Sequence, residues 1–235
     1  MLLEQATGRT GLRASICRLG QIAGPVGVDY RQGMWPKQEW FPTPYLSPAS
    51  YVLTQPTKIV TSSRYLGLLP AEMGPIRMVD WIPVDVAAAV VVDVAGLPNP
   101  EALSSGSTVP ALSERSASNP NGKVSPPVYH VSSPTAIEWT ALAPVVAKRL
   151  GDSVRMVSWG EWMEALRRSS RNVPGAKGVL QNPALKLLDF LESLSQGAEW
   201  PRLAVDRALE KSSSMARLEP NYCDWMNTWM DQWGL

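Results

Sequence analysis

The stretch RLGQIAGPVG, Arg18 to Gly27, decides how the fold is read. It continues the apolar run ASICRL, and three glycines stand at Gly20, Gly24 and Gly27. An apolar strand that enters a glycine-rich turn is the first half of a dinucleotide-binding loop. The second half is a helix directly after the turn, whose N-terminus faces the pyrophosphate.

The residues after Gly27 do not predict such a helix. The sequence VDYRQGMWPKQEWFPTP contains Gly33 and three prolines and has no 3.6-residue periodicity, which is typical of a loop. The glycine spacing, G-x-x-x-G-x-x-G, also differs from the dinucleotide pattern. We therefore interpret Arg18–Gly27 as a strand followed by a glycine/proline turn.

Composition sets broad limits on the protein class. The chain has 235 residues, 45% of them hydrophobic, which is enough for one large domain or two small ones. A net charge of +1 gives no indication of a nucleic-acid or anionic-membrane partner. No apolar run of about 18 residues predicts a membrane span, and no signal peptide is recognisable. Cys17 and Cys223 lie far apart, which favours a reducing compartment, and we expect a cytoplasmic protein.

Apolar strands alternate with amphipathic helices along the chain, which predicts an α/β fold with a parallel sheet. The expected strands are residues 12–23, 127–133 and 154–159. The expected helices are residues 1–10, 85–96, 137–151, 160–170, 182–194 and 221–233. Two details are specific: Asp85 is expected to cap its own helix, and Pro144 to lie in a first helical turn.

The last of these helices carries tryptophans at positions 225, 229 and 233, one turn apart on one face. Such a stripe is more often core than ligand site, although a ligand role remains the alternative. His130, the only histidine, lies inside the apolar run VYHVSS. We favour a hydrogen-bonded core histidine there over a catalytic one.

Searches for familiar catalytic patterns give negative results. No cluster of metal ligands, no G-x-S-x-G elbow and no P-loop is present. Short-chain reductases use a tyrosine with a lysine four residues later, yet none of the six tyrosines has lysine at that position. We therefore assign no catalytic and no metal-binding residue.

Seven segments nevertheless form a specific ordered set: RTGLRASICRLGQIAGP, GMWPKQEWFP, SSRYLGLLP, VDWIPVDVAA, VYHVSSPTAIEW, VSWGEWMEAL and WMDQWG. The set resembles thioester reductase domains, which end fungal non-ribosomal peptide synthetase-like (NRPS-like) and polyketide enzymes. These domains belong to the extended short-chain dehydrogenase/reductase class. The resemblance covers nearly the whole chain except residues 97–127 and a piece near 44–58.

In that family the glycine-rich cofactor loop and the Tyr-x-x-x-Lys pair precede the R-x-G-Q-I strand. The resemblance is therefore to the C-terminal half of a reductase domain. It implies an α/β fold with a partial Rossmann-like sheet and a C-terminal helical substrate-binding region. The implied division is residues 1–96 as the Rossmann-like part, 97–127 as a disordered Ser/Pro-rich linker and 128–235 as the substrate-binding region.

The resemblance also implies site residues. Gly20, Gln21 and Ile22 would approach NADPH, mostly through the backbone. The acyl-substrate cleft would be walled by Trp35, Trp40, Trp81 and Pro83.

The implied reaction is hydride transfer from NADPH to an acyl thioester on the phosphopantetheine arm of a carrier protein, giving an aldehyde or an alcohol. Because the cofactor loop and the Tyr-Lys pair are absent, we expect the chain to be truncated and inactive alone. The alternatives are a non-catalytic module that binds acyl groups or carrier proteins, and a decayed gene product. Residues 44–58 look inserted, either as a retained intron or as a loop extension.

Overall fold

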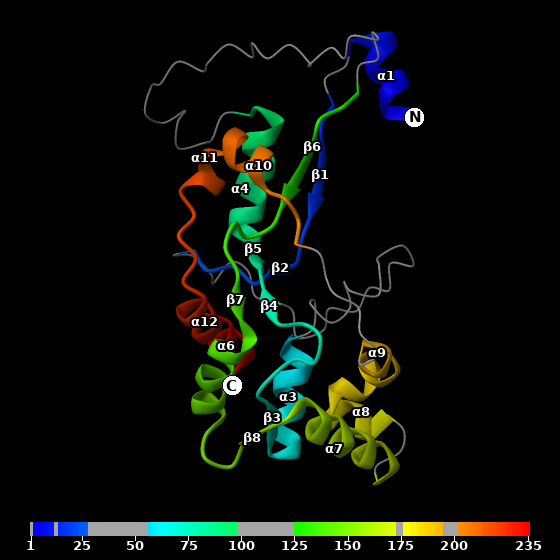
Figure 1. The fold of residues 1–235 in the computed structure, drawn as a ribbon, viewed down its shortest axis with the longest axis vertical. Coiled ribbons are helices and arrows are strands. Elements are labelled where there is room, and N and C mark those ends of the chain that lie inside the picture. Colours follow the sequence, from blue (N-terminus) through cyan, green and yellow to red (C-terminus); the bar gives the residue numbers. More distant parts are fainter. Residues whose placement is uncertain (1, 12–13, 28–55, 98–124, 173–175, 195–201) are drawn as a thin grey trace.

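The computed structural model describes residues 2–11, 14–27, 56–97, 125–172, 176–194 and 202–235. Figure 1 shows an elongated molecule with α1 and the N-terminus at one end and α7 and α8 at the other. The strands are β1 (Ile16–Leu19), β2 (Ile22–Ala23), β3 (Leu68–Pro70), β4 (Met78–Val79), β5 (Ile82–Pro83), β6 (Val128–Val131), β7 (Ile137–Glu138) and β8 (Arg155–Val157). The helices are α1 (Leu2–Thr10), α3 (Pro56–Leu66), α4 (Val84–Ala95), α6 (Trp139–Leu150), α7 (Trp159–Asn172), α8 (Ala176–Gln181), the 3-10 helix η2 (Pro183–Leu187), α9 (Leu188–Leu194), α10 (Asp206–Lys211), α11 (Ser213–Ala216) and α12 (Tyr222–Trp233).

The described strands form four separate pairs. The pairs β1–β6, β2–β5 and β3–β8 are parallel, and β4–β7 is antiparallel. The predicted α/β class with parallel pairing is thus confirmed.

The single strand expected over residues 12–23 is wrong, because the chain changes partner in the middle of it. Gly20 donates its N–H to Val131 O at the end of β6, at 2.8 Å. Gln21 O already accepts from Ile82 N of β5, at 2.9 Å. Passing from one ladder to the next divides the apolar run into β1 and β2.

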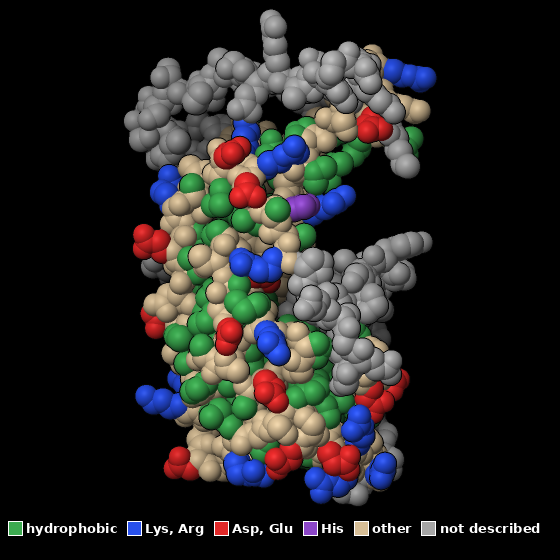
Figure 2. Space-filling model, in the orientation of Figure 1, with side chains coloured by type: hydrophobic (Ala, Val, Ile, Leu, Met, Phe, Trp, Pro, Cys, Tyr) green, Lys and Arg blue, Asp and Glu red, His purple; other side chains and the backbone are tan. Residues whose placement is uncertain are grey.

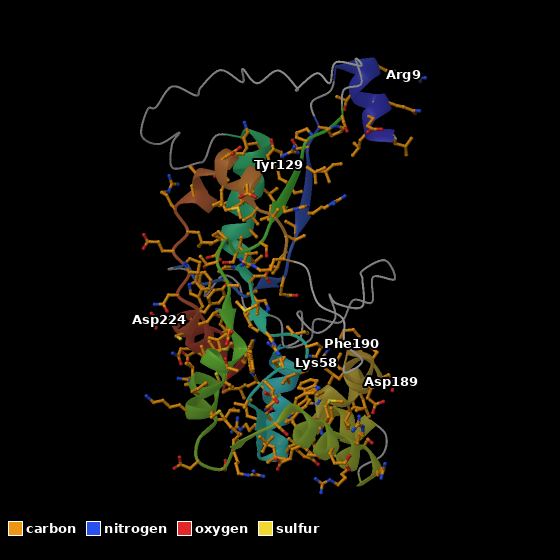
Figure 3. All side chains as sticks on the ribbon, viewed as in Figure 1. Arg9, Lys58, Tyr129, Asp189, Phe190 and Asp224 are labelled. Atoms are coloured by element: carbon orange, nitrogen blue, oxygen red, sulfur yellow. The ribbon has the colours of Figure 1, made fainter. Side chains whose placement is uncertain are left out.

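The first hydrophobic cluster, which we call the upper cluster, joins α4, β6, α10 and α11 (Figure 1). Tyr129 of β6 packs against it, beside α4 (Figure 3). Its buried members are Ile82, Ala87, Val90, Val94, Val131, Ala208 and Met215.

A carboxylate on α4 ties α11 to the upper cluster. Asp93 accepts from the backbone N–H of Ser214 at 2.9 Å and from the Ser212 hydroxyl at 2.8 Å. Burial raises the pKa of Asp93, but these hydrogen bonds outweigh burial and hold the pKa below its ordinary value.

The second hydrophobic cluster, the lower cluster, is built by α3, α6, α7, η2 and α12 around strands β3 and β8. Trp139, Trp162 and Trp229 are fully buried in it. Trp225 and Trp233 are buried as well, so the core interpretation of the tryptophan stripe is confirmed.

Two helices differ in detail from the prediction. Pro144 lies at the sixth residue of α6 rather than in its first turn. Because proline has no N–H, the Thr140 carbonyl loses its helical partner there. The single helix expected over residues 182–194 begins instead as the 3-10 helix Pro183–Leu187, and α9 continues it.

The helix α3 begins inside residues 44–58, the segment expected to be inserted. It begins at Pro56, and Lys58, Ile59 and Val60 are buried. The last three residues of the segment expected to be inserted, 56–58, therefore belong to a helix of the core, and residues 44–55 lie outside the described residues. Most of the expected linker, residues 98–124, also lies outside them.

The described helices include none that is both long enough and apolar enough to span a membrane. The expected division at residues 96 and 128 stays a prediction.

Among the described residues, strand β1 has one edge without a partner strand. Ile16 and Gly20 donate to Pro127 O and Val131 O, and β6 is the only described strand that pairs with β1. In a parallel ladder alternate residues point their N–H groups to opposite edges, so those of Cys17 and Leu19 face away from β6. An open strand edge favours self-association.

We therefore predict that Cys17→Pro lowers self-association and leaves the β1–β6 ladder in place, because the lost N–H faces the open edge. Arg18→Pro is the matched control, since its N–H faces β6 and its loss should destabilise the fold. Sedimentation velocity and urea unfolding of both variants test this. Equal destabilisation by the two prolines would contradict the assignment of the open edge.

Candidate functional site

The segment Gly20–Ile22, which we call the strand end, runs from the carboxyl end of β1, where α/β proteins bind ligands, to the first residue of β2. Its polar groups are largely engaged within the protein. Besides the two ladder bonds described above, the Gln21 side-chain amide donates to Ile22 O at 2.8 Å. Gln21 is buried, whereas Gly20 and Ile22 are partly exposed.

The end of β6 packs tightly against this strand end. A Cβ atom at Gly20 would lie 2.5 Å from the Ser132 hydroxyl oxygen, so only glycine fits there. Ser132 donates its hydroxyl to Asp80, whose backbone oxygen lies at 3.0 Å and carboxylate at 3.1 Å. The Ser133 N–H donates to Asp80 O at 3.1 Å, so the segment before β5 is tied to the end of β6.

The glycine/proline turn after β2 holds a carboxylate of the protein itself. Asp85 accepts from the N–H of Gly27 at 2.7 Å and of Val26 at 3.3 Å. The expected capping role of Asp85 is wrong: α4 is preceded by Pro83 at its N-cap, without a side-chain cap. The amides that would cradle a phosphate are occupied, which agrees with our interpretation of the sequence.

The other side of the same turn is held by α12. The indole N–H of Trp229 donates to Gly24 O, and the side-chain amide of Gln232 donates to Pro25 O, both at 2.9 Å. All four groups are buried. The turn is therefore fixed from two directions, by α4 and by α12.

Two of the four predicted substrate-binding residues lie in the described part of the chain. Trp81 is 2% exposed and packs against Trp229, with ring centroids 5.9 Å apart. Pro83 is buried and pairs with Ala23 in the β2–β5 ladder. Trp35 and Trp40 lie outside the described residues. A substrate-binding role for these residues stays a prediction, as does contact of Gly20–Ile22 with NADPH.

Tyr222 of α12 lies beside the segment before β5, with its hydroxyl 3.4 Å from Trp81 O. Its hydroxyl donates to Thr135 O at 3.0 Å. Burial, reinforced by the charge of Asp80 and opposed by Ser133 and Arg202, raises the pKa of Tyr222 well above its ordinary value. Its proton is therefore held by the backbone, and Tyr222 does not replace the missing Tyr-Lys pair.

His130 makes the predicted hydrogen bond, with its Nδ1 3.0 Å from Ala204 O. The prediction that it lies in the core is wrong, because its side chain is only partly buried and reaches the surface (Figure 2). In the described part of the chain, no group of three or more His, Cys, Asp or Glu residues could hold a metal ion. The face shown in Figure 2 carries intermixed acidic and basic side chains, so it offers no patch of a single charge sign.

Sequence reasoning missed most of the residues that build this edge. They are Asp80, Ser132, Tyr222, Gln232 and, in its true role, Asp85. One signal was available, because the two carboxylates of DWIPVD flank a short apolar strand. Their partners are more than 50 residues away, and no local pattern identifies them.

No family model matches the chain. It is 29% identical over 238 residues to the carboxylic acid reductase of Neurospora crassa, covering 99% of this chain and 19% of that protein. It is 29% identical over 226 residues to a non-reducing polyketide synthase of Stachybotrys chartarum, covering 93% of this chain and 7% of the relative. An adenylate-forming reductase of Heterobasidion annosum is 29% identical over 195 residues, covering 82% and 13% respectively.

The chain thus spans less than a fifth of the length of each of these relatives. The predicted resemblance to a fungal thioester reductase domain is confirmed by these similarities.

We predict that Trp229→Phe lowers the free energy of unfolding by about 1–3 kcal/mol, because it leaves the buried Gly24 carbonyl without its donor. Trp225→Phe is the control, since that ring packs in the same stripe without bonding the turn. Urea unfolding followed by circular dichroism measures both. An equal loss in the two variants would show that packing alone, rather than the hydrogen bond, is at stake.

Proposed function

We propose that the chain is part of an NADPH-dependent thioester reductase, which releases a carrier-bound acyl or peptidyl thioester as an aldehyde or an alcohol in secondary metabolism. The observation that carries this proposal is the similarity of 99% of the chain to a protein named carboxylic acid reductase. The similarity to a polyketide synthase and to an adenylate-forming reductase supports a substrate that arrives on a carrier.

The described residues fit one end of the cofactor. Gly20 and Ile22 are partly exposed, and Gly20 directly follows the carboxyl end of β1, where a flat ring would approach the backbone. The turn Val26–Gly27 does not fit the pyrophosphate, because Asp85 already occupies its amides. NADPH would supply the hydride, and the strand end would orient its nicotinamide.

The chain's own contribution is therefore binding and orientation rather than proton transfer. The turn held by Asp85, Trp229 and Gln232 keeps the strand end in place. Trp81 and Pro83 would give an apolar wall behind the acyl group, in keeping with the apolar lining of small-molecule sites. Within the described residues, Tyr222 would not supply the proton for the product, since its hydroxyl donates to Thr135 O.

A region swap tests the proposal. The 238-residue region of the Neurospora crassa protein that matches this chain is replaced by the chain, and NADPH oxidation with an aromatic or aliphatic acid is measured. We expect the chimera to reduce the acid, and the chain alone to oxidise no NADPH with an acyl-pantetheine thioester. The control chimera carries Gly20→Leu, whose side chain collides with Ser132.

Two results would contradict the proposal. A chimera that folds but does not reduce the acid would contradict the reductase assignment. Binding of a carrier protein by the chain alone, together with an inactive chimera, would favour the non-catalytic module instead.

A further inference from the structure

The amides of Val26 and Gly27 converge on one carboxylate of α4. Gly27 donates to Asp85 Oδ2 at 2.7 Å, and Val26 lies 3.3 Å from the same oxygen. Successive backbone N–H groups of this kind form an anion-binding concavity. Here the anion is a carboxylate of the protein itself, so these two amides are not available to a free phosphate.

This contact leaves little space for adjustment. A Cβ atom at Gly27 would lie 2.8 Å from Asp85 Oδ2, so a side chain there would push the turn off the carboxylate. Asp85 lies in the first turn of α4, and Ala87 and Val90 bury that helix in the upper cluster. The carboxylate is thus a fixed point to which the turn is attached.

Apart from the hydrogen bonds that Gly24 O and Pro25 O accept from α12, the strand that this turn continues has few other restraints. Strand β2 has only two residues, and its ladder with β5 has only two paired positions, Ile22 with Ile82 and Ala23 with Pro83. A ladder that short does not fix its own register, so the ends of the segment must be held. Asp85 supplies the hold on the amide side of the turn.

We propose that Asp85 is a positioning residue for the strand end Gly20–Ile22, the segment that would orient the nicotinamide; this inference rests on the proposed function. Asp85 acts through the turn Val26–Gly27 and β2. The negative charge matters, because Val26 N also lies 3.4 Å from Oδ1, and an asparagine whose oxygen accepts from Gly27 would place its NH₂ group there.

A second carboxylate of the same helix provides a matched control. Asp93 lies eight residues later on α4 and accepts the Ser214 N–H at 2.9 Å, which fastens α11. Asp93→Asn removes the same charge from the same helix. It should loosen residues 212–216 and leave the strand end unchanged.

The experiment is amide hydrogen exchange by NMR on the full chain, without cofactor, for wild type, Asp85→Asn and Asp93→Asn. We expect Asp85→Asn to speed exchange at Gln21–Ala23 by about tenfold or more, and to move the Gly27 amide proton resonance upfield. Asp93→Asn should do neither. If exchange at Gln21–Ala23 stays at the wild-type rate, or rises equally in both variants, the positioning role is overturned.

Gly27→Ala tests the same link without changing Asp85, so the inference stays testable if Asp85→Asn does not fold. It should also speed exchange at Gln21–Ala23, and wild-type rates there would overturn the inference. Addition of NADP⁺ to the wild type is read separately. Unchanged resonances at Gly20–Ile22 would count against the proposed function, whereas the exchange rates without cofactor decide the role of Asp85.

Discussion

The hydrogen bond from the Trp229 indole to Gly24 O joins residues 205 positions apart, and the arrangement of the molecule depends on it. Helix α12 packs on α6 within the lower cluster, while the side chains of Trp229 and Gln232 donate to the turn that follows β2. Asp85 joins the same turn to α4 of the upper cluster. Helix α12 thereby connects the two hydrophobic clusters through the candidate site, and Leu218 packs against both clusters.

The local patterns in the sequence predicted the helices and strands well where burial follows a simple period. The Trp225–Trp233 face and strand β6 are examples, because each depends on neighbours within a few residues. The break at Gly20 could not be predicted in this way, since it arises from two partner strands far along the chain. The start of α3 at Pro56 was hidden for a related reason, because buried Ile59 and Val60 rather than local propensity define it.

The candidate site shows the same contrast between local patterns and partners far along the chain. Gly20 was identified through the resemblance, but the structure gives it a further reason, the close approach of Ser132. The role of Asp85 was misassigned because an aspartate at a helix start usually caps that helix. In this protein Asp85 accepts the N–H groups of a distant turn. The glycine-rich stretch therefore resembles a phosphate loop, but its amides are already hydrogen-bonded.

Native-state hydrogen exchange at increasing urea tests most directly whether α12 makes the two clusters one unit. The amides of Val90 in the upper cluster and of Leu166 in the lower cluster report the two sides. If the account is right, both exchange through one unfolding step with a common dependence on urea. Two separate steps, with the upper cluster opening while α12 remains protected, would contradict it.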